Sequence, residues 1–343
     1  MYGRDESHAG SLRHGFVAGG LRHMHNHANR CNHVGRASFL PGRNHAGPTP
    51  STPKPPCESD TVADGGECTM PARGPHISEL FDLTGRVAMV TGGAQNLGLD
   101  MAEALGEAGA DLVITSRKLE KAERAAEELS DRIGVDVLPL PLDITDTDLV
   151  EETFERVAEE CGRLDVLVNN AGGTRLSEDS GVLIAERSPE DFAHVVNLNL
   201  VGTFHCCHWA VPIMKPQGSG SIINISSISG MVGRDRWVYD GSEEMIPNFA
   251  DYTAAKGGII AFTRDLAAEC GAYGIRANCI SPGGFERGQP EEFIKRYNSH
   301  VMLGRMGRDG VDLKGAVVYL ASDASAYVTA QNLAVDGGFT SWS

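Results

Sequence analysis

Val87-Ala88-Met89-Val90-Thr91 runs directly into Gly92-Gly93-Ala94-Gln95-Asn96-Leu97-Gly98, and an apolar helical pattern follows from Leu99 to about Gly109. A short, continuous apolar run predicts a strand buried on both faces of a sheet. The glycines alone are consistent with a turn that only joins a strand to a helix. In this context the turn meets a helix N-terminus, where backbone N–H groups and the helix dipole attract an anion. The stretch therefore predicts a pyrophosphate site of a dinucleotide.

Short β-branched runs alternate with amphipathic helical stretches from Leu83 onward. We expect strands near residues 86–91, 111–116, 136–141, 164–168, 220–225, 275–280 and 331–335, with helices between them. This alternation is typical of a parallel sheet with helices on both faces. The predicted fold class is α/β, a doubly wound seven-stranded parallel sheet (Rossmann fold) in a single domain. Ligands should bind beyond the carboxyl ends of its strands.

The overall composition excludes several kinds of partner. The 343 residues are 41% apolar and carry a formal net charge of -16. This acidic balance argues against nucleic acid, which needs a basic patch, and against an anionic membrane surface. No apolar run approaches the roughly 18 residues that span a bilayer. We expect a cytoplasmic protein with a small-molecule substrate, and no nucleic-acid or membrane partner.

The first 75 residues differ in kind from the rest. Seven histidines are scattered among Gly, Arg, Pro and Ser without an apolar period, which predicts a disordered, His-rich extension ahead of a catalytic domain over residues 76–343. No metal site is expected there, because Met24-His25-Asn26-His27 lacks an ordered scaffold. The five cysteines of the domain have no repeated spacing and are expected to be reduced core thiols.

The end of the second predicted strand bears on cofactor choice. An acidic residue about 20 positions after the glycines binds the ribose 2′-hydroxyl of NAD, whereas a nearby Arg suits the 2′-phosphate of NADP. Ser116 occupies the place of the acid, and Arg117 follows it. NADP(H) is therefore favoured, and NAD(H) stays open because Arg117 can also be read as a solvated charge at a helix start.

Tyr252-Thr253-Ala254-Ala255-Lys256 sets a phenol and an ammonium four residues apart in a helical stretch. Positions i and i+4 share one helix face, so the Lys charge can favour the phenolate. A phenol, with a pKa of about 10, needs such help to act as a general base near neutral pH. The pattern alone is weak, because this spacing recurs by chance.

Taken together, these motifs resemble those of the short-chain dehydrogenase/reductase family. Its Thr-Gly-x-x-x-Gly-x-Gly turn is similar to residues 91–98, with Asn96 at the usual place of the middle glycine. Asn tolerates left-handed backbone angles, so we expect the turn to survive. Leu142-Asp143-Ile144 and Asn169-Asn170-Ala171-Gly172 extend the resemblance. It implies that Asp143 contacts the adenine and that residues 169–172 line the cofactor, although Asp143 can also be read as a helix cap.

The resemblance also implies four catalytic residues: Asn199, Ser227, Tyr252 and Lys256. Tyr252 would exchange a proton with the substrate oxygen, which Ser227 hydrogen-bonds; Ser226 is its nearest competitor. Lys256 would lower the pKa of Tyr252 and hold the nicotinamide ribose. Asn199 would position a water, or else satisfy buried backbone groups.

Ser281-Pro282-Gly283-Gly284 resembles the family's turn beside the nicotinamide, and residues 285–307 stand where the family has a substrate-covering segment. Within it, residues 290–297 predict a capped amphipathic helix. The whole predicted cofactor site is Gly92, Asn96, Leu97, Gly98, Ser116, Arg117, Asp143, Ile144, Asn170, Ala171, Gly172, Tyr252, Lys256, Pro282 and Gly283.

Ser227 and Tyr252 lie 25 residues apart, where many relatives have about a dozen, so the chain carries an insertion within residues 234–247. Long loops beside an active site set specificity, although this one can instead pack on a neighbouring subunit. Val335 to Trp342 is similar to the ending of the gluconate 5-dehydrogenase and sugar-polyol branch. The resemblance implies a homotetramer that oxidises or reduces a sugar-like substrate. The alternatives are a 3-oxoacyl-thioester reductase and a non-catalytic dinucleotide-binding regulator.

Overall fold

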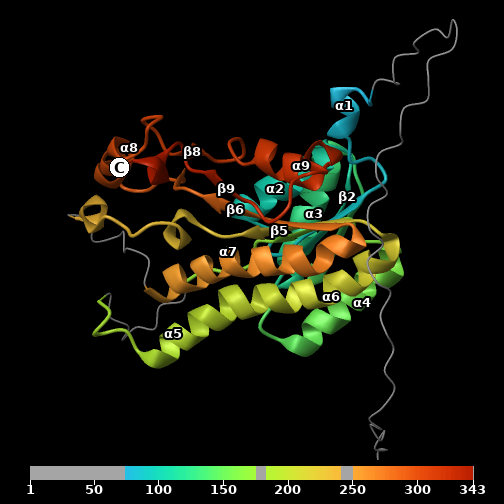
Figure 1. Cartoon of the computed structure of the whole chain (residues 1–343), viewed down its shortest axis with the longest axis horizontal. Helices are drawn as coiled ribbons and strands as arrows, with labels where there is room; N and C mark the ends of the chain where they lie inside the picture. Colours follow the sequence, from blue (N-terminus) through green and yellow to red (C-terminus); the bar gives the residue numbers. More distant parts are fainter. Residues whose placement is uncertain (1–73, 175–182, 241–249, 343) are drawn as a thin grey trace, which may run out of the picture. The chain divides into compact units, whose positions relative to one another are not determined.

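The computed structural model describes residues 74–174, 183–240 and 250–342 (Figure 1). The disorder predicted for the His-rich extension falls outside these residues apart from Gly74 and Pro75, and so do residues 241–247 of the insertion. The domain boundary near residue 75 stays a prediction.

Seven parallel strands form the central sheet. They are β1 (Val87–Val90), β2 (Asp111–Ser116), β3 (Val137–Pro141), β4 (Val166–Asn169), β5 (Gly220–Ile225), β6 (Ile275–Pro282) and β9 (Asn332–Val335). Their order is β3-β2-β1-β4-β5-β6-β9, and every neighbouring pair is parallel. The predicted fold class is confirmed. The order reverses between β1 and β4, so the crevice at their carboxyl ends is the expected ligand site.

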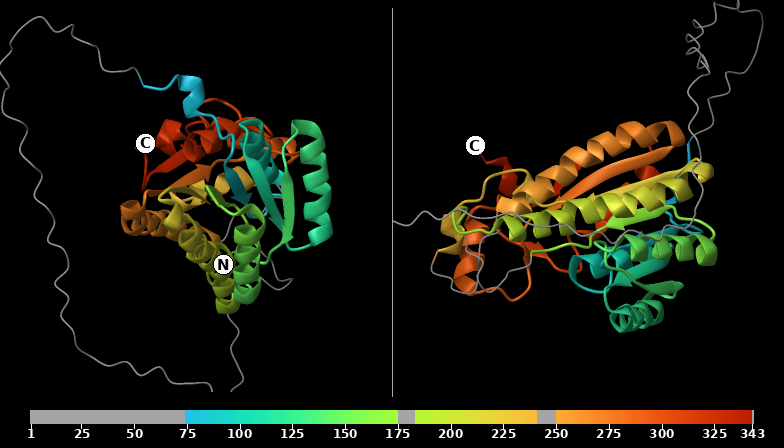
Figure 2. Two further views of the ribbon diagram at one scale, coloured as in Figure 1. Left: turned by 90° about the vertical axis from the view of Figure 1, so that its right-hand side faces the viewer. Right: turned by 90° about the horizontal axis from the view of Figure 1, so that it is seen from below.

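Helices cover both faces of the sheet (Figure 2). The helices α2 (Asn96–Glu107), α3 (Leu119–Ile133) and α9 (Lys314–Ala321) pack on one face, and α4 (Thr147–Cys161), α6 (Gly202–Gln217) and α7 (Ala250–Cys270) pack on the other. The short helix α1 (Ile77–Leu80) precedes β1, and α5 (Pro189–Val196) leads toward α6.

Alternation along each strand explains this layering. In β1, Ala88 and Val90 enter the core under α2, whereas Val87 and Met89 enter the core over α4 and α6. Successive side chains of a strand point to opposite faces, so a strand covered on both faces needs an unbroken apolar run. All four residues of β1 are accordingly buried.

Shorter elements lie near the carboxyl ends of the strands. They are the π-helix η1 (Asn197–Val201), the 3-10 turns η2 (Ile228–Gly230) and η3 (Arg236–Tyr239), helix α8 (Glu291–Ser299), and the paired β7 (Phe285–Glu286) and β8 (Gly307–Arg308). Further 3-10 turns are η4 (Gly271–Tyr273), η5 (Asp323–Ser325) and η6 (Phe339–Ser341). The helix predicted over residues 290–297 exists as α8, but the capping prediction is wrong, because Pro290 stands at its N-cap without a side-chain hydrogen bond.

Four of the five cysteines in the described part of the chain are buried, and all five are free thiols. Burial raises the pKa of the Cys206 thiol to about 12 and that of Cys279 to about 11, so neither is a reactive thiolate near neutral pH. In the same described ranges, no helix combines the length and apolar character needed to cross a bilayer.

Candidate active site

The glycine-rich turn between β1 and α2 has the shape of an anion cradle. Gly92 adopts a left-handed backbone with φ of 64°, and Asn96 does the same with φ of 51°, as its place in the turn led us to expect. A Cβ on Gly98 would stand 2.3 Å from the Gly92 carbonyl oxygen, so this position admits no side chain. Gln95, at the N-cap of α2, provides no side-chain cap for the first N–H groups of that helix. These groups are the donors that a pyrophosphate needs, so the turn fits a dinucleotide.

Asn170 fixes the position of this turn. Its side-chain Nδ2 donates to the carbonyl oxygens of Thr91 at 3.0 Å and of Gly92 at 3.2 Å. The backbone N–H groups of Asn170 and Ala171 both donate to the Thr91 hydroxyl at 3.0 Å. The end of β4 is thus tied to the end of β1, and the predicted residues of both motifs meet at the point where the strand order reverses.

The adenine end of the predicted site gathers around β2 and β3. Burial acts to raise the pKa of Asp143, but hydrogen bonds from Thr145 and the positive charge of Arg117 outweigh it, so that pKa lies below its usual value. Arg117 is exposed and Ser116 is half-buried. The side chains of Ile144 and Leu97 pack against the apolar cores on opposite faces of the sheet. Ile144 is buried and offers a ligand its backbone groups, whereas Leu97 is only partly buried.

Lys121 is a basic residue that the sequence analysis missed. Gln95 is not basic, and no second cation was expected beside Arg117. In the structure, the Lys121 ammonium donates a hydrogen bond to Gln95 Oε1 and so reaches the glycine-rich turn from the first turn of α3. The spacing of 26 residues between them gives no local signal. The role of Lys121 becomes visible only in the folded chain, where its ammonium contacts Gln95 at the start of α2.

Tyr252 and Ser227 come together at the chemical end of the site, where the Ser227 hydroxyl is near enough to the Tyr252 phenol to oppose the rise that burial causes in the pKa of Tyr252. Ser227 follows β5, and its hydroxyl also lies 3.3 Å from the Ser229 hydroxyl. Ser226, the competing candidate, is turned away: its hydroxyl donates to the Lys256 carbonyl oxygen at 2.7 Å. The contacts therefore favour Ser227 over Ser226 as the serine that meets a substrate.

Lys256 lies on the same face of α7 as Tyr252, with Nζ 5.5 Å from the centre of the Tyr252 ring. Its ammonium donates to the Ile225 carbonyl oxygen at 2.8 Å, and burial lowers the pKa of Lys256 to about 8. Burial also raises the pKa of Tyr252, a rise that the Ser227 hydrogen bond and the charge of Arg234 oppose. The expectation that Lys256 lowers the pKa of Tyr252 stays a prediction. Lys256 is itself desolvated and turned toward the end of β5.

Asn199 is fully buried in the π-helix η1, within a stretch predicted to be regular helix. Its Nδ2 donates to the Gly173 and Val195 carbonyl oxygens at 2.7 and 2.9 Å, and its Oδ1 accepts from the Gly173 N–H at 3.0 Å. A Cβ on Gly172 would lie 2.5 Å from Asn199 Oδ1 and 3.8 Å from Lys256 Nζ. These contacts agree with the alternative interpretation, in which Asn199 forms the hydrogen bonds of buried backbone groups. Asn199 also lies near Lys256. Its relay role stays a prediction.

The turn at Pro282-Gly283 borders the site from β6. The Gly283 N–H donates to the Val335 carbonyl oxygen at 3.0 Å, and a Cβ on Gly283 would stand 3.3 Å from the Tyr297 hydroxyl. That hydroxyl accepts the Gly284 N–H at 2.5 Å. Tyr297, on α8, is thereby fixed against the turn that was predicted to adjoin the nicotinamide.

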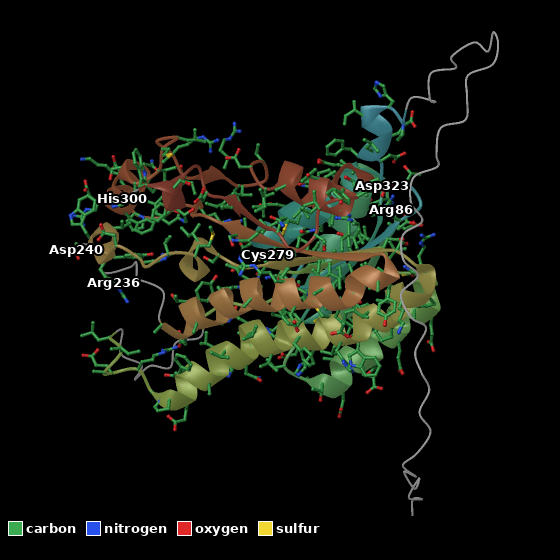
Figure 3. All side chains as sticks on the ribbon, viewed as in Figure 1. Arg86, Arg236, Asp240, Cys279, His300 and Asp323 are labelled. Atoms are coloured by element: carbon green, nitrogen blue, oxygen red, sulfur yellow. The ribbon has the colours of Figure 1, made fainter. Side chains whose placement is uncertain are left out.

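The described part of the insertion packs on α8 of the same chain. The Tyr239 and Phe293 rings lie 5.4 Å apart, and the His300 imidazole stands 5.6 Å from the Trp237 ring and 3.2 Å from the Asp235 carboxylate. Arg296 donates to the Asp240 carbonyl oxygen. Figure 3 shows Arg236, Asp240 and His300 together at one end of the domain, away from the Arg86–Asp323 ion pair at the other end.

A buried ion pair adjoins the catalytic helix. Arg187 lies 2.5 Å from Asp251, and their side chains are 2% and 0% exposed. Asp251 also accepts the N–H of Tyr252 at 2.6 Å. The sequence does not indicate either residue, because charges 64 residues apart give no local pattern.

Comparison with known proteins agrees with this geometry. The family model described as "Enoyl-(Acyl carrier protein) reductase" matches residues 92–340. The chain is 35% identical to the 3-oxoacyl-[acyl-carrier-protein] reductase of Chlamydia muridarum over 260 residues, which are 75% of this chain and 98% of that protein. It is 37% identical to the NADP-dependent mannitol dehydrogenase of Hypocrea jecorina over 269 residues, 76% of this chain and 95% of the relative.

Among solved structures, it is similar to a gluconate 5-dehydrogenase from Burkholderia cenocepacia in complex with NADP and tartrate. The two share 32% identity with a TM-score of 0.70, over 78% of this chain and 100% of that one. These relatives are named as dehydrogenases and reductases. The chain is an oxidoreductase that acts on CH–OH groups with a nicotinamide cofactor, and it belongs to the short-chain dehydrogenase/reductase family.

Proposed function

We propose that this enzyme prefers NADP(H) and transfers a hydride between the nicotinamide and a secondary alcohol or ketone of a small, polar, sugar-like substrate. The observation that carries the proposal is the grouping of Tyr252 and Ser227 beside the buried Lys256, bordered by a polar inserted segment. Phenol, hydroxyl and ammonium are the groups that proton exchange with a substrate oxygen requires.

The cofactor, when bound, supplies or accepts the hydride. In reduction, the Tyr252 hydroxyl donates its proton to the substrate carbonyl oxygen, and in oxidation the phenolate takes the proton back. The Ser227 hydroxyl holds that oxygen in place. Lys256 would contribute the positive charge that holds the nicotinamide ribose. Asn199 keeps the Gly173 backbone beside it by two hydrogen bonds, one donated and one accepted, and donates a third to the Val195 carbonyl oxygen.

A preference for NADP(H) is supported by the two cations at the adenine end. Arg117 stands directly after Ser116, where an NAD-binding acid is missing, and the Lys121 ammonium contacts Gln95. A 2′-phosphate needs positive charge at this place, whereas a 2′-hydroxyl needs an acceptor. The relatives named as NADP-dependent or crystallised with NADP give independent support.

The sugar-like substrate is supported by the mannitol and gluconate dehydrogenases among the relatives and by the polar groups of residues 234–240. A 3-oxoacyl-thioester reductase is the second candidate, because a 3-oxoacyl-[acyl-carrier-protein] reductase is 35% identical to this chain. Against it stands the net charge of -16, since an acidic carrier protein docks on a basic surface. We also propose a homotetramer in the cytoplasm.

Replacing Tyr252 by Phe tests the assignment of the proton donor. The Tyr252→Phe variant keeps the ring but loses the only exchangeable proton of that side chain, so turnover should fall at least about a hundredfold. Affinity for NADPH, measured by its fluorescence, should change less than about threefold, because the ring and Lys256 remain. The matched control is Tyr273→Phe, which changes an exposed tyrosine at the last position of η4. A Tyr252→Phe enzyme with more than a few per cent of wild-type activity contradicts the assignment.

A panel of aldonates, polyols, keto-sugars and 3-oxoacyl thioesters, followed by NADPH or NADH absorbance, tests the substrate class. The proposal expects the highest kcat/KM on a polyhydroxy substrate and at least a tenfold preference for NADPH over NADH, equivalent to about 1.4 kcal/mol. Preferential turnover of the thioester would establish the second candidate in its place.

A further inference from the structure

Arg234, from the inserted segment, lies at the chemical end of the site and was not singled out from the sequence as a ligand. Its Nε donates to the Ser229 hydroxyl at 3.0 Å, and that hydroxyl lies 3.3 Å from the Ser227 hydroxyl. Two hydrogen bonds therefore separate the guanidinium from the serine that meets the substrate oxygen. The structure therefore places the Arg234 cation near the proposed reacting groups and not at the glycine-rich turn, where the phosphates are predicted to bind.

Aromatic groups hold this guanidinium in place. Its Cζ lies 5.7 Å from the centre of the buried Tyr239 ring, within range of a cation–π contact. Its charge opposes the rise that burial causes in the pKa of Tyr252 and of Tyr297, so both hydroxyls lie within its field. Tyr252 comes from α7 and Tyr297 from α8. The guanidinium thus stands between the catalytic helix and the segment expected to cover the substrate.

The guanidinium has unused binding capacity. Within residues 74–174, 183–240 and 250–342, no carboxylate forms an ion pair with Arg234, and only its Nε makes a hydrogen bond. An Arg offers five N–H donors in a planar fork, so the two terminal nitrogens remain for a ligand. Burial lowers the pKa of Arg234, yet a guanidinium stays charged near neutral pH. A half-buried cation of this kind is a binding site for an anion.

We propose that Arg234 binds a carboxylate of the substrate and that the enzyme acts on hydroxy or oxo acids rather than on neutral polyols. One cation beside two neutral phenols compensates one negative charge, which matches a carboxylate better than a phosphate dianion. The planar fork of Arg also pairs with a carboxylate through two parallel hydrogen bonds. The inference rests on the proposed function and narrows its substrate class.

Binding to the NADPH complex tests the inference without turnover, because an alcohol cannot react with reduced cofactor. The probes share a hydroxyl pattern and differ in charge: D-gluconate has a carboxylate, D-glucitol is neutral and D-glucitol 6-phosphate has a phosphate. Wild-type protein should bind gluconate at least about tenfold more tightly than glucitol, as expected for charge-assisted hydrogen bonds. Gluconate should also bind more tightly than glucitol 6-phosphate. Calorimetric titration measures all three.

Variants at Arg234 then assign the discrimination to this residue. Arg234→Gln should abolish the preference for gluconate while changing glucitol affinity less than about threefold, and Arg234→Lys should retain part of it. Arg236→Gln, an exposed neighbour two residues away, is the control and should bind like wild type.

Three results overturn the inference. Equal affinity of wild-type protein for gluconate and glucitol shows that no carboxylate is recognised. Tighter binding of glucitol 6-phosphate shows that the anion is a phosphate. The third result has two parts: Arg234→Gln loses affinity for gluconate and glucitol equally, and its pH profile of kcat/KM on a neutral substrate moves to higher pH. That combination shows that Arg234 acts through Tyr252 instead. If the enzyme turns over no substrate in the panel, the proposed function is rejected. The comparison of ligand affinities tests the role of Arg234 separately from turnover.

Discussion

At the scale of single residues, the site combines groups whose pKa values burial shifts from their ordinary values. The pKa of Tyr252 lies above its usual value and that of Lys256 falls to about 8. Both shifts have one cause, since desolvation disfavours a phenolate and an ammonium alike. The free enzyme therefore holds Tyr252 in its proton-donating form near neutral pH, which suits ketone reduction.

This charge pattern predicts a pH dependence for reduction. Because the pKa of Lys256 is lowered to about 8, its ammonium is charged below that pH and neutral above it, whereas an ordinary lysine stays charged to higher pH. Tyr252 keeps its proton through the same window, since its pKa is raised. We expect kcat/KM for reduction to be level below about pH 7 and to fall toward tenfold per pH unit above pH 8.

Initial rates between pH 6 and 10 measure this profile, with a stability check at each pH. Lys256→Arg retains the charge at high pH, so its residual activity should not show the fall. A wild-type profile that stays level to pH 10 contradicts a role for the charged Lys256.

Residue roles were the part of the site that the sequence predicted least completely. Motif residues such as Gly92, Asn170 and Tyr252 have local patterns, and the structure brings them to one crevice. Lys121 and Arg234 have no such pattern, because each reaches the site from an element whose position depends on packing. The effect of Lys256 on Tyr252 stays a prediction, because sequence spacing fixes the face of a helix but does not show how deeply either group is buried.

At the scale of elements, the catalytic helix α7 is anchored at its start by the buried pair of Arg187 and Asp251. Removing one partner of a buried pair leaves an uncompensated charge and costs about 3–5 kcal/mol. Asp191, 3.6 Å from Arg187, reduces that cost. We expect Asp251→Asn to destabilise the enzyme by about 3 kcal/mol and to lower kcat, because Asp251 also accepts the Tyr252 N–H.

Denaturant unfolding measures this effect, with Glu160→Gln as the control. Glu160 pairs with Arg156 on the surface of α4, where such pairs contribute about 0.3–0.5 kcal/mol. The double variant with Arg187→Met should lose less than the sum of the single losses. Strictly additive losses would mean that the two side chains are not energetically coupled.

Element boundaries in the sheet were predicted well, because unbroken apolar runs and glycine turns are local signals. All seven strands formed within two residues of the predicted limits at each end. The π-helix at Asn197–Val201 was missed, since its extra residue depends on the tertiary contacts of Asn199 with Gly173. The short strands β7 and β8 were missed as well, because two-residue strands carry no periodicity.

At the scale of the whole molecule, two surfaces are suited to self-association. Phe204 on α6 is 49% exposed, and the centre of its ring lies 6.1 Å from the centre of the Phe262 ring on α7. At one edge of the sheet, β9 pairs only with β6 among the described strands. Two independent interfaces are what a tetramer of dihedral symmetry requires.

We therefore expect light scattering to give a mass of four chains. Phe204→Glu places a charge on the face of α6 and α7 and should reduce the mass to that of a smaller species. Ile77→Glu, which changes an exposed apolar residue of α1, should leave the mass unchanged. A wild-type monomer at micromolar concentration contradicts the tetramer.

The contact between the inserted segment and α8 has a consequence for how new activities can arise on this scaffold. Tyr239, Trp237 and Asp235 of the insertion touch Phe293 and His300, whereas the hydride machinery is built on β5 and α7. We therefore expect the two segments to be exchangeable only together. Grafting the insertion alone onto a relative would separate Trp237 and Tyr239 from His300 and Phe293, so residues 285–308 would have to be transferred with it.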